Sequence, residues 1–533
     1  MSVMRISFRV ILMLVFCCAL THIGKSQTTF EKTYGGTSDE RAFSVNSTTD
    51  KGFIMAGYTD SYGVGDNDFY VIKTDSAGNA IWAKTYGGAH DDEAYAAQQT
   101  TDGGYIIAGY SNSFGATNYD AYLVKTNAQG DTLWTRTYGG GKDDYANAIQ
   151  QTADGGYVFS GYTTSFVSSP DSGNIYLVKT DVNGNLSWSK SLGATLNISD
   201  GYSVRQTADK GYIITGYTNG FGEPNGDAFL FKTDSMGTVS WTKTYGSPGL
   251  DWGNSVKQTN DGGYIIAGSS SFDSTNLIDV YVIKTNAIGD TLWTKTYGGA
   301  GYDFGQTIEQ TTDGGYIITG YTNTCDTCNY NVYLIKTDAN GNLLWSNTNG
   351  GSGDDEGNSV YQTTDGGYII AGLTSSFGAG NYNFYLLKTD ANGNSCNQTN
   401  SNNTMKNPAT MQSNQIMRTY TTNTQVHNVN TLIDTGNVIT NACYSAGIKY
   451  IAENQPFINL FPNPNNGTFT ISCNSISKDN LIVSIENNLG ENMYTKTILS
   501  SEEINLQNLS SGIYIARVRF SNNIYSQRIV VIK

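Results

Sequence analysis

The chain of 533 residues is rich in glycine and tyrosine and poor in charge. It contains 61 Gly, 37 Tyr and only 7 Pro, and charged residues make up 14% of it, which is typical of turn-rich β structure rather than helix. The formal net charge of −15 excludes the broad basic surface that proteins use to bind nucleic acid.

The N-terminus has the layout of a secretory signal. Residues 1–26 contain two arginines, then the apolar run VILMLVFCCAL and small residues, which predicts a signal peptide cleaved before Gln27. Lipid attachment at Cys17 or Cys18 is an alternative. No later apolar run reaches the ~20 residues that a transmembrane helix needs, so we expect an exported protein without a transmembrane segment.

The main part of the chain is a repeat. Its "DGGY" element recurs seven times, 52 residues apart except for one step of 55, and its aromatic residues are Phe53, Tyr105, Tyr157, Tyr212, Tyr264, Tyr316 and Tyr368. Each repeat reads as four short strands separated by Asp-Gly turns, Ser/Gly/Asn loops and "ANG" turns. Seven copies of such a unit predict an all-β propeller with four-stranded blades.

The ends of the repeat region indicate how the ring closes. A tryptophan recurs in the fourth strand of six repeats, at Trp82, Trp134, Trp188, Trp241, Trp293 and Trp345. The seventh repeat lacks this strand, but "FEKTYGG" from Phe30 matches "WAKTYGG" from Trp82. We predict a seven-bladed propeller over 27–396 in which the N-terminal strand completes the last blade and hides both sheet edges. The repeat resembles those of extracellular bacterial β-propeller proteins of the "DGGYIIAGY" kind.

The chain changes character after the repeats. Residues 397–455 are rich in Asn, Thr and Ser and predict a linker. Residues 456–533 predict some seven short strands, consistent with a small immunoglobulin-like β-sandwich.

This tail resembles the type A C-terminal sorting domain of the type IX secretion system. The residues that carry the resemblance are Pro462, Asn463, Pro464, Gly467, Gly512, Ile513 and Tyr514, together with the terminal "QRIVVIK". The resemblance implies the type IX machinery as a partner, passage through both membranes, and release or attachment at the cell surface. An ordinary immunoglobulin-like domain is the alternative.

Five cysteines remain after the signal, which is an odd number for an oxidising compartment. The "CDTC" pair, Cys325 and Cys328, lies between predicted strands and favours a local loop disulfide. Cys396 and Cys443 could link the ends of the segment between them.

An acidic position recurs ten residues before the "DGG" aspartate in six repeats. Its members are Glu40, Asp92, Asp144, Asp251, Asp303 and Asp355, with Ser199 in the fourth repeat. These carboxylates could ring the channel mouth and bind Ca²⁺, the one cofactor the sequence suggests. The alternative is that each accepts backbone N–H bonds where blades join.

One position varies strongly within this constant frame. It lies one residue after the acid and is occupied by Arg41, Glu93, Tyr145, Asp200, Trp252, Phe304 and Glu356. Variation on a rigid scaffold is typical of binding specificity, and the aromatic members could stack on a sugar or an aromatic peptide group. Packing between blades is the alternative for these aromatics. We assign the recurring "KT" lysines no part in function.

The sequence favours a non-enzymatic binding protein for a glycan or protein ligand. After the signal only His90 and His427 remain, and no catalytic triad or metalloprotease motif is present. A carboxylate-dependent polysaccharide hydrolase or lyase is the first alternative, and a structural surface protein without a small ligand is the second.

Overall fold

The computed structural model describes residues 28–115, 118–167, 169, 172–193, 197–222, 225–271, 277–323 and 328–395, and from 398 to 531 the strands and short connections given below. Every regular element among these residues is a β-strand. The predicted signal peptide, Cys325 and Cys396 lie outside the described residues. Cys328 is disulfide-bonded.

The chain forms two compact units, residues 1–447 and 448–533. In the first unit, four antiparallel strands recur as one sheet per repeat. Repeat 1 contains β2 (Glu40–Ser47), β3 (Phe53–Thr59), β4 (Asp68–Thr74) and β5 (Ala80–Tyr86). Repeat 2 contains β6 (Asp92–Gln99), β7 (Tyr105–Ser111), β8 (Asp120–Thr126) and β9 (Thr132–Gly139). Repeat 3 contains β10 (Ala148–Gln151), β11 (Tyr157–Thr163), β12 (Asn174–Thr180) and β13 (Leu186–Gly193).

The later repeats follow the same plan. Repeat 4 contains β14 (Ser199–Gln206), β15 (Tyr212–Thr218), β16 (Asp227–Thr233) and β17 (Val239–Gly246). Repeat 5 contains β18 (Asp251–Gln258), β19 (Tyr264–Ser270), β20 (Asp279–Thr285) and β21 (Thr291–Gly298). Repeat 6 contains β22 (Asp303–Gln310), β23 (Tyr316–Thr322), β24 (Asn331–Thr337) and β25 (Leu343–Asn349). Repeat 7 contains β26 (Asp355–Gln362), β27 (Tyr368–Thr374) and β28 (Asn383–Thr389).

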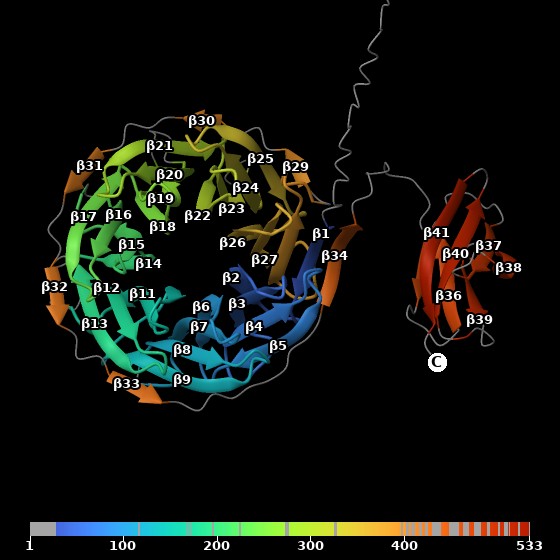
Figure 1. Ribbon diagram of the computed structural model, residues 1–533, viewed down its shortest axis with the longest axis horizontal. Coiled ribbons are helices and arrows are strands. Elements are labelled where there is room, and N and C mark those ends of the chain that lie inside the picture. The colour runs from blue at the N-terminus through green and yellow to red at the C-terminus, as the bar shows by residue number, and fades with distance from the viewer. Residues whose placement is uncertain are drawn as a thin grey trace, which may run out of the picture. The chain divides into compact units, whose positions relative to one another are not determined.

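The fourth strand of repeat 7 comes from the other end of the chain. β1 (Thr28–Tyr34) pairs antiparallel with β28, and Phe30 lies opposite Lys388. Figure 1 shows the sheets arranged around a circle, with the first strands of the repeats innermost. Repeat 7 is the neighbour of repeat 1, because β2 contacts β26, β27 and β28.

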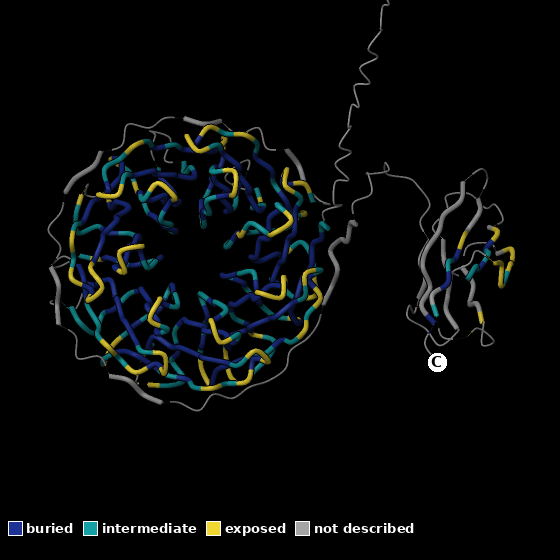
Figure 2. Tube along the Cα trace, viewed as in Figure 1, coloured by how far each residue is buried: buried dark blue, intermediate teal, exposed yellow. Residues whose placement is uncertain are grey.

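Each pair of neighbouring repeats shares a hydrophobic core. The two faces of β7 show this clearly: Ile107 packs in a cluster with Ile54 of repeat 1, whereas Ile106 packs in a cluster with Phe159 of repeat 3. Side chains alternate between the faces of a strand, so a strand that is apolar on both faces is buried between two sheets. Figure 2 shows buried residues filling the ring, with exposed residues concentrated at the turns.

A tryptophan links each fourth strand to the next repeat. Gly184 has a φ of +75°, and a Cβ at this position would lie 2.8 Å from Trp134 of the preceding repeat. Only glycine therefore fits beneath the indole. Phe30 takes the same place over Gly78, where an added Cβ would lie 2.6 Å from its ring. The N-terminal strand thus repeats the contact that joins the other neighbours.

Residues 398–446 differ from the predicted linker, because they contribute strands to the outer edges of the repeats. These strands are β29 (Gln398–Asn400), β30 (Thr404–Lys406), β31 (Met411–Asn414), β32 (Arg418–Thr421), β33 (Gln425–Asn428) and β34 (Ile439–Ala446). They pair in turn with repeats 6, 5, 4, 3, 2 and 7, and we call them the outer belt. The fourth strands present unpaired backbone groups, and a polar segment can satisfy these without a hydrophobic core of its own.

The second unit contains two sheets among its described strands. One consists of β35 (Ile458–Phe461), β36 (Thr468–Cys473) and β39 (Ser501–Asn505). The other consists of β37 (Leu481–Glu486), β38 (Asn492–Ile498), β40 (Gly512–Phe520) and β41 (Asn523–Val531). Val483, Ile485 and Ala516 of the second sheet are fully buried.

Candidate binding site at the central channel

The first strands of the repeats surround a cavity of about 1140 Å³, which we call the channel. Side chains from all seven described repeats line it. In six of these repeats the first strand carries a β-bulge, which in repeat 1 falls between Ala42 and Ser44. A bulge places two residues opposite one on the neighbouring strand and turns the extra side chain away from the regular alternation.

The recurring acids lie beside the channel but do not line it. Asp92 is fully buried, and its Oδ2 accepts the N–H of Gly88 at 2.8 Å and the hydroxyl of Ser113 at 2.8 Å. Glu40, Asp144, Asp251, Asp303 and Asp355 accept the equivalent N–H four residues earlier. These bonds hold the link between one sheet and the next.

The residues described here contain no group of three or more His, Cys, Asp or Glu side chains placed to hold a metal ion. Each recurring acid already serves a backbone donor on its own link. The calcium site therefore stays a prediction from the sequence, and no contact of these side chains supports it.

Burial changes the ionisation of the recurring acids. It raises the pKa of Asp92 to about 6, and hydrogen bonds to its carboxylate limit the rise. The pKa of Asp144 rises to about 7 through burial, and the nearby charge of Asp120 adds to the rise. Burial likewise raises the pKa of Asp303 to about 7. These carboxyl groups titrate far above the usual range of aspartate.

The varied residues are all half-buried and follow the acids at the start of the first strands. Tyr145, Asp200 and Glu356 line the channel. Arg41 lies with its guanidinium 4.6 Å from the ring centroid of Tyr382. Glu93 accepts bonds from the side chains of Asn67 at 3.2 Å and Tyr95 at 3.3 Å.

Tyr145 belongs to an aromatic group on one side of the channel. Its ring meets that of Tyr110 edge to face at 4.8 Å and stacks on Tyr119 at 5.7 Å. Tyr95 and Phe43 continue the group with stacked rings 4.7 Å apart.

Trp252 and Phe304 form a second aromatic group at a pocket of about 350 Å³. Their rings stack at 6.4 Å, and Phe304 also contacts Tyr321 at 4.8 Å. The pocket is lined by Tyr202, Tyr217, Leu250, Trp252, Asn254, Phe304, Gln306 and Tyr321. Tyr202, Asn254, Gln306 and Tyr321 also line the channel, so the two spaces are adjacent.

Two acids at the varied position have strongly raised pKa values. Burial raises the pKa of Asp200 to about 7, although the amide of Asn147 donates to it at 2.8 Å. Burial also raises the pKa of Glu356 to about 7, and the charge of Arg41 opposes that rise. Perturbed acids in a cavity are typical of functional sites, although structural networks produce them too.

A further set of channel residues was not singled out from the sequence. Arg205, Lys257 and Glu309 lie five residues after the varied position, on β14, β18 and β22, and all three line the channel. An alignment of the repeats contains the signal, since Asn46, Gln98 and Gln150 occupy the same position. The charged residues replace the amides in only three repeats, so they do not form a recurring motif.

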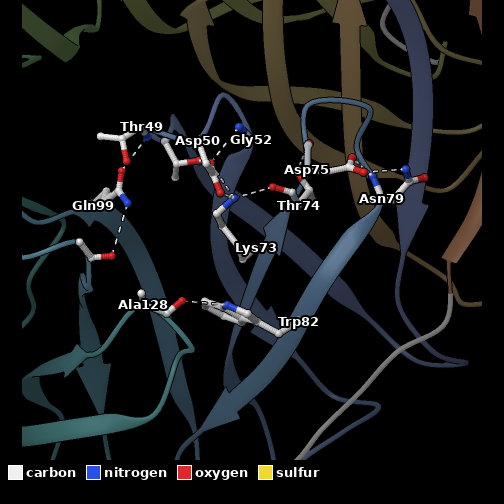
Figure 3. A network of polar contacts seen from close by, with 12 residues as sticks. Thr49, Asp50, Gly52, Lys73, Thr74, Asp75, Asn79, Trp82, Gln99 and Ala128 are labelled. Atoms are coloured by element: carbon white, nitrogen blue, oxygen red, sulfur yellow. Dashed lines mark hydrogen bonds and ion pairs between the residues drawn. The ribbon is translucent and has the colours of Figure 1, made fainter.

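The "KT" lysines bind the aspartates of the "DGG" turns. In Figure 3, Lys73 pairs with Asp50 and also donates to the carbonyl of Thr74. The figure also shows Gln99 accepting the N–H of Thr49 across the repeat boundary, and Trp82 donating to Ala128. Every described repeat has the same lysine–aspartate pair, so these lysines belong to the scaffold.

The sorting-motif residues fall partly within the described structure. Gly512 begins β40, and Tyr514 is buried and donates its hydroxyl to the carbonyl of Ser510 at 3.0 Å. Pro462, Asn463, Pro464 and Gly467 lie outside the described residues.

The chain thus combines an all-β region of repeated four-stranded sheets with a separate C-terminal unit. A family model described as the secretion system C-terminal sorting domain matches residues 459–533. The protein is therefore exported by type IX secretion to the cell surface or the extracellular space, and its tail interacts with that machinery. No helix in the described ranges is long and apolar enough to cross a membrane.

Two further similarities concern larger proteins. The chain is 26% identical over 149 residues to the regulatory protein FlaEY of Caulobacter vibrioides, an alignment that spans 24% of this chain and 16% of that protein. The extracellular domain of a hybrid two-component system from B. thetaiotaomicron aligns over 94% of this chain and 81% of its own. It does so with 9% identity and a TM-score of 0.26.

Proposed function

We propose that the repeat region is a seven-bladed β-propeller that binds its ligand at the channel mouth formed by the varied positions. The circular arrangement of the sheets (Figure 1) and the hydrophobic cores shared by neighbouring repeats support this architecture. The rigid frame holds side chains of six different types at seven equivalent places, which is how binding scaffolds generate specificity.

The observation that carries the proposal is the aromatic pocket that shares four lining residues with the channel. Trp252, Phe304 and Tyr321 supply flat apolar surfaces, and Asn254 and Gln306 supply amide donors and acceptors beside them. A sugar ring has apolar faces and a polar edge, so this combination fits a glycan. A protein ligand with aromatic groups is the other occupant that the site would accept.

A glycan array probed with the mature protein tests the proposal. The Trp252→Ala variant should lose at least tenfold in affinity for any glycan found, and its melting temperature should stay close to that of the parent. Trp241→Ala is the matched control, because Trp241 packs against Gly289 of the next repeat and its loss should reduce stability. Unchanged binding combined with reduced stability in Trp252→Ala would assign that residue to packing.

A carboxylate-dependent polysaccharide hydrolase or lyase is a second candidate. Asp200 and Glu356 line one cavity, and burial raises the pKa of each to about 7, which suits a general acid. Polysaccharides that bind should be incubated with the parent and with Asp200→Asn and Glu356→Gln, and the reducing ends or unsaturated products measured. Binding without product formation would reject this candidate.

We also propose that residues 456–533 form a small immunoglobulin-like sandwich whose Pro462 to Gly467 and Gly512 to Tyr514 segments the secretion machinery recognises. Removing residues 456–533 should leave the protein in the periplasm, as measured by cell fractionation. Secretion of the shortened chain would contradict this assignment.

A further inference from the structure

Charge is distributed unevenly around the channel. The position five residues after the varied one lines the channel in every described repeat, with Asn46, Gln98, Gln150, Arg205, Lys257, Glu309 and Tyr361. Repeats 1–3 place neutral amides there, and repeats 4–6 place charges. One wall is therefore charged and the opposite wall is neutral.

The charged residues replace a bond that holds neighbouring repeats together. The Oε1 of Gln98 accepts the N–H of Gln151 at 2.9 Å, and the Oε1 of Gln150 accepts the N–H of Gln206 at 2.6 Å. Arg205 and Lys257 carry donors and no acceptor, so they cannot make this bond. Glutamine at both positions could make the bond between repeats, so packing of the scaffold does not explain the two cations.

The three charged residues at this position are two cations and one carboxylate. Lys257 forms an ion pair with Glu309, and both side chains are 21% exposed. Arg205 donates to the neutral carbonyl of Val204 at 2.8 Å, and the carboxylate whose charge acts on it, Glu309, is already paired with Lys257. Two partly buried cations that share one carboxylate are an unfavourable arrangement. A carboxylate entering the channel would correct the balance, and the planar guanidinium offers it paired donors.

The aromatic pocket and the charged wall lie on the same strands. Trp252 and Lys257 belong to β18, whereas Phe304 and Glu309 belong to β22. One of the five intervening steps is taken up by the bulge, so about four remain, or roughly 13 Å at the usual rise per residue. A ligand that reaches both places must be an extended chain.

We infer that Arg205 and Lys257 form a carboxylate-binding subsite and that the ligand is an acidic polysaccharide carrying uronate groups. The inference rests on the proposed glycan-binding function and names its substrate class. The sugar faces stack at Trp252 and Phe304, and a carboxylate farther along the chain meets the guanidinium of Arg205.

Other charged groups around the channel set a dependence on pH. Asp200 and Glu356 line the channel, Glu93 and Arg41 hold the equivalent positions of repeats 2 and 1, and Glu309 lies beside Lys257. Burial raises the pKa of both Asp200 and Glu356 to about 7. They lose negative charge as the pH falls through 7, while a uronate stays ionised, so binding should tighten between pH 8 and pH 6.

The test measures binding of three probes to the mature protein by isothermal titration calorimetry. They are tetragalacturonate, the neutral cellotetraose and a hexaglutamate peptide. The parent should bind tetragalacturonate at least tenfold more tightly than either of the others. Arg205→Gln, which copies Gln98 and Gln150, should remove most of that preference, and Glu309→Gln should tighten binding of the acidic sugar several-fold. Lys142→Gln is the control for net charge, because Lys142 is exposed on a loop.

The outcomes separate this inference from the proposed function. Binding of cellotetraose without any preference for the acidic sugar overturns the inference and leaves glycan binding in place. Binding of neither sugar, together with an empty glycan array, removes both. Equal losses in Arg205→Gln and Lys142→Gln reject the channel subsite, and hexaglutamate binding that depends on Arg205 rejects a polysaccharide in favour of an acidic peptide.

Discussion

At the scale of single residues, the links between repeats bury carboxyl groups close together. The charge of Asp120 contributes to the raised pKa of Asp144, and a Cβ at the intervening Gly139 would lie 2.7 Å from Asp144 Oδ2. The bare glycine leaves room for the two side chains. A neutral Asp144 therefore suits this link better than an ionised one.

Asp144 should make stability depend on pH. Its pKa is about 7 in the folded protein against 3.8 for the exposed group, so between these values the folded state binds more protons than the unfolded state. The free energy of unfolding then falls as the pH rises from about 4 to about 7. Asp144→Asn should flatten this dependence and raise the free energy of unfolding at pH 8 by about 1 to 3 kcal/mol.

Urea unfolding of the parent and the variant at pH 5 and pH 8 measures this effect. Asp60→Asn is the control, since Asp60 is exposed and should give equal changes at both pH values. A variant that is equally destabilised at both pH values would show that Asp144 is needed as an ionised acceptor.

Alanine should destabilise the protein more at a glycine beneath a tryptophan than at a glycine in an open turn. Gly184 and Gly155 both have positive φ, of +75° and +85°, but an added Cβ would meet Trp134 at Gly184 and nothing within 4 Å at Gly155. Both alanine variants carry the backbone strain of roughly 1 kcal/mol. Gly184→Ala should lose at least about 1 kcal/mol more than Gly155→Ala in thermal unfolding, because overpacking adds to it. Equal losses would mean that the indole contact contributes nothing.

The residues that repeat can be located from the sequence, because the acids, the tryptophans and the "KT" lysines recur with fixed spacing. Their bonds recur as well, but no contact tests the metal-binding role that the sequence suggests for the acids. Arg205, Lys257 and Glu309 were missed because each differs from its counterparts, and only the bulge and the ring geometry show that their side chains meet in one cavity.

At the scale of elements, the outer belt is the largest difference from expectation. The repeat strands can be recognised in the sequence because both of their faces are buried and therefore carry apolar residues. The belt strands attach through backbone hydrogen bonds at a sheet edge, and such pairing requires no apolar pattern. An Asn- and Thr-rich segment therefore reads as a linker even where it pairs, as Thr419 does with Leu192.

Removal of the belt should expose the fourth strands. In a chain of residues 27–395, hydrogen exchange at the backbone of β13 should accelerate relative to a chain of residues 27–447, because β13 loses its pairing with β32. β12 is the control, since it pairs with β11 and β13 in both chains. Unchanged protection of β13 would mean that the belt is not paired in solution.

At the scale of the whole molecule, the N-terminal strand joins repeat 7 to repeat 1. Phe30 and Tyr34 of β1 share a core with Phe53 and Met55 of repeat 1 and with Phe384 of repeat 7. The sequence predicted this strand from a single match, with Phe30 in place of tryptophan, and the pairing of β1 with β28 agrees with it.

Phe30→Ala should therefore weaken the ring by about 3 to 5 kcal/mol, which is the usual cost of removing a buried phenylalanine. Phe30→Trp, which copies the other six repeats, should change stability by no more than about 1.5 kcal/mol. Differential scanning calorimetry of both variants checks this. An unchanged melting temperature in Phe30→Ala would show that the ring is held without the N-terminal strand.

The pairing of β1 with β34 also brings the first and last strands of this unit side by side. Thr28 lies opposite Ala446, so the chain enters and leaves this unit at one end of the same antiparallel pair. Traction on the chain beyond Ala446, as during export, would load the hydrogen bonds of that pair one at a time instead of all together. β34 should therefore peel away under low force while the four-stranded sheets, including β1 on β28, stay intact. The pairing of β34 with β1 is therefore the first joint that we expect to open when the tail is pulled.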